Sequence, residues 1–130
     1  MKKTFKIAGI LSVIVLFVMI GLYAYLHFIV FEDPFDNKTF ERSVWIKNQN
    51  NMNPDNPRGE MYKDLVENKL KIGMTKDEII ALFGKADFKT EKRFLSYNLG
   101  MWSGFRMDYD SLDLEFDDQN QLKQFYRVQH

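Results

Sequence analysis

The segment 70-LKIGMTKDEIIALFG-84 decides the fold, because it contains the start, the apolar face and the end of one helix. Thr75 and Glu78 have the spacing of a capping box, in which the hydroxyl accepts from a backbone N–H three residues later and the carboxylate accepts from the threonine N–H. Gly84 follows the last apolar residue, where a residue with positive φ commonly ends a helix. The segment therefore predicts a short helix between Thr75 and Gly84.

A first helix is predicted before this segment. Pro57 is favourable in a first helical turn, and Met61, Leu65 and Val66 recur at helical spacing through residues 58–68. Two helices, each with one apolar face, therefore precede the C-terminal third of the chain.

The C-terminal third changes to a period of two. Apolar residues alternate in 94–99 and 112–117, residues 117–120 form a polar turn, and residues 121–129 return as a third strand. Phe125 breaks the alternation, which predicts a bulge or an edge position there. Residues 57–130 therefore predict an α+β domain in which two helices pack on a three-stranded antiparallel sheet, in two layers.

The N-terminal part contains a long apolar run. Residues 7–31 are 25 residues without Asp, Glu, Lys, Arg or Pro, and about 20 apolar residues suffice to cross a bilayer as a helix. This run predicts a transmembrane signal-anchor helix in contact with the lipid bilayer. A cleaved signal peptide is the alternative, although the run is longer than the usual ~7–15 residues.

Charge sets the orientation predicted for this helix. The basic tail 1–6 precedes the run and acidic residues follow it, which predicts a cytoplasmic N-terminus and a C-terminal domain outside. Tyrosines near the end of the run suit the headgroup layer. The residues expected at the membrane interface are Lys2, Lys3, Lys6, Tyr23 and Tyr25.

Residues 32–56 predict a juxtamembrane stalk, because Asn and Pro are enriched after Asn48 and stop any helix there. Trp45 lies within this segment. It either packs back on the domain or makes a separate contact with the membrane or a partner.

The residue types exclude several classes of function. The 18 basic residues are matched by 18 acidic ones and form no basic patch, so no nucleic-acid partner is expected. The acidic residues around Asp113 fail the spacing of a calcium-binding loop, so no metal is expected. His130 is the only histidine outside the apolar run and has no obvious nucleophile beside it. We therefore expect no enzymatic activity, no cofactor and no small-molecule substrate.

The loop between the first two strands is the candidate site. Residues 101–107 combine Trp, Phe, Arg and two Met, a composition enriched at protein interfaces. Trp102, Phe105 and Arg106 are therefore predicted to bind a partner. The alternative is that Trp102 caps the end of a small core.

Several residues resemble the signature of the SmpA/OmlA (BamE-like) envelope proteins. The resemblance covers about residues 58–128 and includes Gly73-Met74-Thr75, Glu78 and Phe83-Gly84-Lys85. Further matching residues are Arg58, Met61, Asp64, Leu65, Leu70, Leu82 and Asp87. It implies an α-α-β-β-β fold and a non-enzymatic accessory module facing the periplasm or the cell exterior. The best-known members are lipoproteins that support outer-membrane β-barrel assembly, whereas this chain has no cysteine to carry a lipid.

Two functions follow from the sequence. The first is a membrane-anchored accessory or scaffold protein that binds an envelope protein complex, held in a bacterial cytoplasmic membrane by a single span. The alternative is an inhibitor or immunity-type protein that blocks a secreted or periplasmic enzyme or toxin. The partner, the oligomeric state and cleavage of the N-terminal segment stay open.

Overall fold

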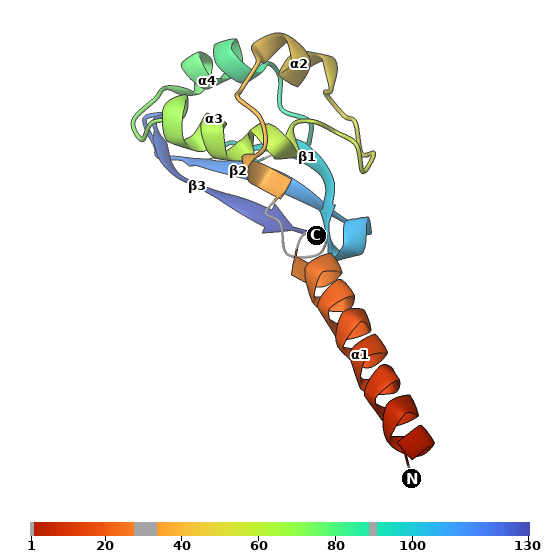
Figure 1. Ribbon diagram of the computed structural model, residues 1–130. Coiled ribbons are helices and arrows are strands. Elements are labelled where there is room, and N and C mark those ends of the chain that lie inside the picture. The colour runs from red at the N-terminus through yellow and green to blue at the C-terminus, as the bar shows by residue number, and fades with distance from the viewer. Residues whose placement is uncertain (1, 28–33, 89–90) are drawn as a thin grey trace. The chain divides into compact units, whose positions relative to one another are not determined.

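The computed structural model describes residues 2–27, 34–88 and 91–130 (Figure 1). The chain divides into two compact units, residues 1–33 and 34–130. The first unit contains helix α1 (Lys2–Tyr25), and the second contains the sheet and the helices and 3-10 turns from Pro34 onward.

The prediction of a transmembrane helix over residues 7–31 is wrong. Within the described residues, no helix combines the length and the apolar character that crossing a membrane requires. Helix α1 differs from the prediction in its bounds, because it starts inside the lysine-containing tail and ends at Tyr25. Residues 28–31 of the predicted span, and the side chains of Lys2, Lys3 and Lys6, lie outside the described part. Tyr23 and Tyr25 are exposed.

The second unit has a helical layer on one face of its sheet (Figure 1). This layer contains α2 (Arg42–Lys47), α3 (Tyr62–Asn68) and α4 (Lys76–Phe83), with the short 3-10 turns η2 (Pro34–Asp36) and η3 (Gly59–Met61). Helix α4 begins at the predicted capping box: the Glu78 N–H donates to Thr75 Oγ1 at 3.2 Å, and the Thr75 N–H donates to Glu78 Oε2 at 2.8 Å. The sequence signal for this helix is therefore confirmed in atomic detail.

The sheet is antiparallel with the order β1-β2-β3. Its strands are β1 (Phe94–Ser103), β2 (Asp108–Phe116) and β3 (Leu122–Gln129). Leu112 and Leu114 of β2 face the helices and are fully buried. A register shift at the start of β3 pairs Phe116 with Leu122 and Leu114 with Phe125. Because of this irregularity, Leu122 and Phe125 both contribute to the core, which explains the broken alternation in the sequence.

Residues 34–56 pack as part of the domain rather than as a stalk. Phe35 and Trp45 belong to the buried core, and the Trp45 indole N–H donates to the Phe83 carbonyl at 3.1 Å. The Trp45 ring lies 5.6 Å from the Phe83 ring and 6.1 Å from the Tyr97 ring, measured between centroids. Of the two interpretations of Trp45, packing is the one that the structure supports. Residues 32 and 33 of the predicted stalk lie outside the described residues.

Candidate interaction site

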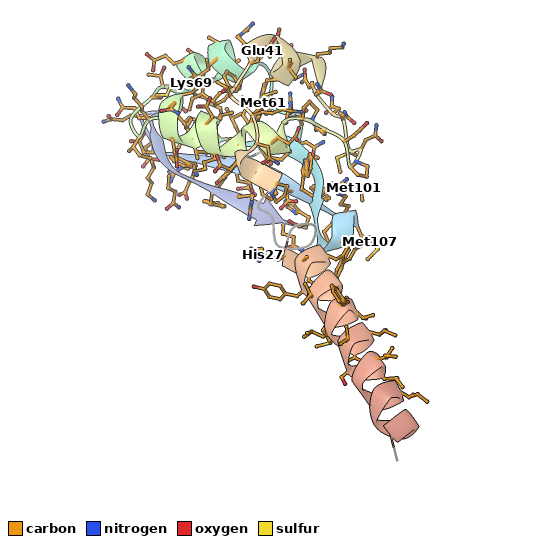
Figure 2. All side chains as sticks on the ribbon, in the orientation of Figure 1. His27, Glu41, Met61, Lys69, Met101 and Met107 are labelled. Carbon is orange, nitrogen blue, oxygen red and sulfur yellow. The ribbon has the colours of Figure 1, made fainter. Side chains whose placement is uncertain are left out.

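The turn between β1 and β2 exposes large apolar side chains. It contains the 3-10 turn η4 (Gly104–Arg106) followed by Met107. The Phe105 side chain is 86% exposed and that of Met107 is 72% exposed. Met107 lies at one end of the sheet, away from the buried Met61 of the helical layer (Figure 2). Within the second unit, no other large apolar side chain is as exposed among the described residues.

The backbone of this turn has an unfavourable conformation. Phe105 has φ 58° and ψ 34°, and Arg106 has φ 63°. This left-handed region costs a residue with a side chain roughly 1–2 kcal/mol. Such a conformation persists only where surrounding contacts enforce it, and it is typical of functional sites.

A buried carboxylate holds the base of the turn. Asp110 is fully buried, and it accepts hydrogen bonds from the Ser103 N–H at 3.0 Å and the Ser103 hydroxyl at 2.7 Å. Gly104 lies directly against the Asp108 carboxylate, since a Cβ atom at Gly104 would be 2.1 Å from Asp108 Oδ2. Gly104 also has φ 54°, a backbone conformation that residues with a side chain rarely adopt, so glycine is favoured as the first residue of the turn.

Trp102 connects the turn to the core. Its indole N–H donates to the carbonyl oxygens of Asn56 at 3.0 Å and Leu99 at 2.8 Å. The ring packs on the backbone at Gly59, where a Cβ atom would lie 2.2 Å from Trp102 Nε1. These contacts make Trp102 a core cap, which is the second of the two roles predicted for it.

The three predicted site residues lie together but differ in role. The Arg106 guanidinium is 5.4 Å from the centroid of the Trp102 ring, a cation–π contact that limits where the arginine can lie. Phe105 and Arg106 are exposed, whereas Trp102 is partly buried. Met107 is a third exposed side chain of this turn. The sequence prediction did not name it as a site residue, although it counted both methionines of the loop.

A chain of hydrogen bonds on the sheet face opposite the helices was also not predicted from the sequence. Ser111 Oγ lies 2.9 Å from His130 Nε2 and donates to Asp113 Oδ1 at 2.8 Å. Ser96 Oγ donates to the same carboxylate oxygen at 2.6 Å. The antiparallel register brings His130 beside β2, where its ring stacks on Tyr109 at 4.3 Å between centroids.

The direction of these hydrogen bonds argues against nucleophilic catalysis. A carboxylate only accepts, so the Ser111 hydroxyl gives its single proton to Asp113. His130 Nε2 therefore donates to Ser111 Oγ and is not available there as a base. Ser111 is also fully buried. The serine and histidine form a satisfied polar chain rather than an activated pair.

Among the described residues, no group of three or more His, Cys, Asp or Glu side chains is arranged to hold a metal ion. A surface hollow lies at the start of α4, but the capping box already uses the N–H groups of Thr75 and Glu78.

We found no protein-family model, curated protein or solved structure that matches the chain.

Proposed function

We propose that the protein is a non-enzymatic binding module that docks onto a protein partner through Phe105, Arg106 and Met107. The observation that carries this proposal is Phe105, whose ring is 86% exposed on a turn with left-handed backbone. Contacts within the domain hold the turn in place while the Phe105 ring stays in water, and a partner that covers the ring would bury its apolar area.

The physical chemistry of the turn supports partner binding. Aromatic residues, Met and Arg are enriched at interfaces, and Arg is among the residue types that most often dominate the binding energy there. The turn is preorganised by the contacts of Ser103 with Asp110 and of Trp102 with Asn56, so little conformational entropy is lost when a partner binds. A non-enzymatic role is further supported by the hydrogen bonds of Ser111, because its hydroxyl donates to Asp113 and accepts from His130.

The resemblance to SmpA/OmlA proteins supports an accessory role in an envelope complex. An inhibitor is the second candidate, because a narrow turn with an aromatic tip fits a concave enzyme site, which is usually lined by apolar groups. The two candidates predict different partners: a multi-protein assembly in the first case, and a single hydrolase or toxin in the second.

Site-specific crosslinking in the source cells tests this proposal. A photoreactive amino acid at position 105 of the full chain is expected to give one defined adduct. The same amino acid at position 72, where Ile72 is 61% exposed away from the turn, is expected to give none. Phe105→Asp is expected to abolish co-purification of the crosslinked protein with an unchanged circular dichroism spectrum. Identical adducts from both positions, or full retention of the partner by Phe105→Asp, would refute the proposal.

A further inference from the structure

Among the described residues, no strand pairs with the outer edge of β3. The sheet order makes β3 an outer strand, with β2 as its single neighbour (Figure 1). At its first residue the outer edge is used, because the Leu122 N–H donates to the Met74 carbonyl and the Leu122 carbonyl accepts from the Gly73 N–H. From Lys123 to Gln129, no backbone hydrogen bond from the described residues reaches this outer edge. A row of unpaired N–H and C=O groups is a template for one more strand.

Arg127 stands on this edge with its guanidinium held in place. It pairs with Leu112 in the sheet and therefore lies on the helix-facing side. Its guanidinium carbon is 3.7 Å from the centroid of the Phe35 ring and 5.7 Å from that of Tyr62. Stacking on an aromatic face leaves the in-plane N–H groups of an arginine available for a carboxylate.

Arg127 has no acidic partner among the described residues, in contrast to basic side chains of the same region. Lys63 pairs with Asp36 at 2.6 Å, and Lys38 pairs with Glu60. No such ion pair involves Arg127, and its side chain is exposed. The Arg127 guanidinium is therefore held by stacking, and no carboxylate of the described residues binds its in-plane N–H groups.

The charges of β3 indicate whether its outer edge pairs with a second copy of this chain or with a different peptide. The strand LKQFYRVQ, residues 122–129, carries two basic residues and no acidic one. Lys123 is already paired with Glu115 of β2 at 3.2 Å, whereas a second β3 strand would offer Arg127 no acidic side chain. The edge therefore favours an acidic strand over its own copy.

We propose that the outer edge of β3 binds an extended peptide that carries an acidic side chain, by strand addition. The peptide carboxylate binds the in-plane N–H groups of Arg127. Because side chains two positions apart on a strand share a face and are ~6.8 Å apart, an apolar side chain two residues from the acid lies beside Phe125. Phe125 is half-buried and packs against the core, so it provides an apolar contact. This surface is separate from the β1–β2 turn, and the inference does not depend on the proposed function.

Peptide titration of the full chain tests the charge requirement. The probe is a fluorescently labelled Thr-Val-Thr-Glu-Thr-Val-Thr peptide with blocked ends, and its matched control has Gln in place of Glu. Binding is measured by fluorescence anisotropy. Arg127→Met, which keeps an apolar stem on the Phe35 ring, is expected to weaken binding of the Glu peptide roughly ten- to a hundredfold. The same variant is expected to leave the weak binding of the Gln peptide unchanged.

Two further measurements separate strand addition from nonspecific charge attraction. Arg93→Met removes an exposed arginine that is paired with Asp118 outside β3, and it is expected to leave affinity for the Glu peptide unchanged. Amide hydrogen exchange is expected to slow at alternate residues of β3 when the Glu peptide is bound. Equal affinity of Arg127→Met and the unmodified chain for the Glu peptide, or unchanged exchange in β3 at saturation, would overturn the inference.

Discussion

Arg58 and Asp87, which are 29 positions apart in the chain, form an ion pair whose side chains are both fully buried, with Arg58 Nη1 2.6 Å from Asp87 Oδ2. Arg58 Nε donates to the Trp45 carbonyl at 2.7 Å, and the guanidinium lies 4.5 Å from the centroid of the Trp45 ring. Asp87 accepts from the N–H groups of Asn50 at 2.6 Å and Asn98 at 3.0 Å. The pair therefore joins the segment after α2, the segment after α4 and strand β1.

Removing one member of this pair is expected to be strongly destabilising. Asp87→Leu leaves the Arg58 charge buried without a counter-charge, and burial already lowers the pKa of Arg58 against the opposing effect of Asp87. Loss of one partner of a buried ion pair costs about 3–5 kcal/mol. The free energy of unfolding in urea measures this change. The double variant Arg58→Met/Asp87→Leu is expected to recover part of the loss, and a fully additive loss would contradict the coupling.

The close contact between Gly59 and Trp102 predicts that replacing Gly59 by alanine destabilises the domain. Gly59→Ala places a Cβ atom 2.2 Å from Trp102 Nε1, so the indole has to move and its two hydrogen bonds are broken. Overpacking of this kind costs about 1–3 kcal/mol. Thermal unfolding of Gly59→Ala, Trp102→Leu and the double variant measures the coupling. If the contact is the cause, Gly59→Ala costs little once Trp102 is replaced. An equal cost in both backgrounds would point to another cause.

The capping box of α4 predicts a loss of stability in acid. The Thr75 N–H, together with the Thr75 hydroxyl, lowers the pKa of Glu78 below its ordinary value of 4.5. Because the folded pKa is the lower one, this stabilisation is complete above the unfolded pKa and disappears as the pH falls through the folded pKa. Between about pH 6 and about pH 2 the melting temperature of Glu78→Gln is expected to fall less than that of the unmodified chain. Parallel curves would exclude Glu78 as a contributor.

The division of the chain into two units predicts that residues 34–130 fold alone. Among the described residues, the buried core lies in this unit, whereas apolar side chains of α1 such as Phe17 and Val18 are exposed. A fragment 34–130 is expected to keep its unfolding free energy within about 0.5 kcal/mol of that of the full chain. It is also expected to be monomeric in analytical ultracentrifugation. A fragment that is unfolded or molten would contradict the division.

Local signals predicted the elements that local interactions stabilise. The cap at Thr75, the end at Gly84 and the alternating strands depend on neighbours within a few residues, and the structure contains each of them. The predicted first helix is shorter than expected, because residues 59–61 form a 3-10 turn and α3 starts at Tyr62. Composition also placed the candidate site in the β1–β2 turn, which stays a prediction, and it did not separate Trp102, which packs against the core, from the exposed Phe105 and Met107.

Long-range packing decided the features that the sequence did not predict. Helix α2 has no side-chain cap and only six residues, so it depends on burying Trp45 under α4 rather than on its own sequence. The Arg58–Asp87 pair and the Ser111–His130 contact join residues distant in the chain, and no periodic pattern marks either of them. The prediction that residues 7–31 span a membrane was wrong, because no helix of the described residues has both the length and the apolar character that a span requires.

The position of Trp102 has an optical consequence. Its indole N–H is shared between Asn56 and Leu99, and its ring carries the Arg106 guanidinium on one side. The other tryptophan, Trp45, is fully enclosed, so its emission is a constant background. If a partner binds the β1–β2 turn as proposed and moves Arg106, the emission wavelength of Trp102 is expected to shift, so the unlabelled protein would report that binding through its own fluorescence.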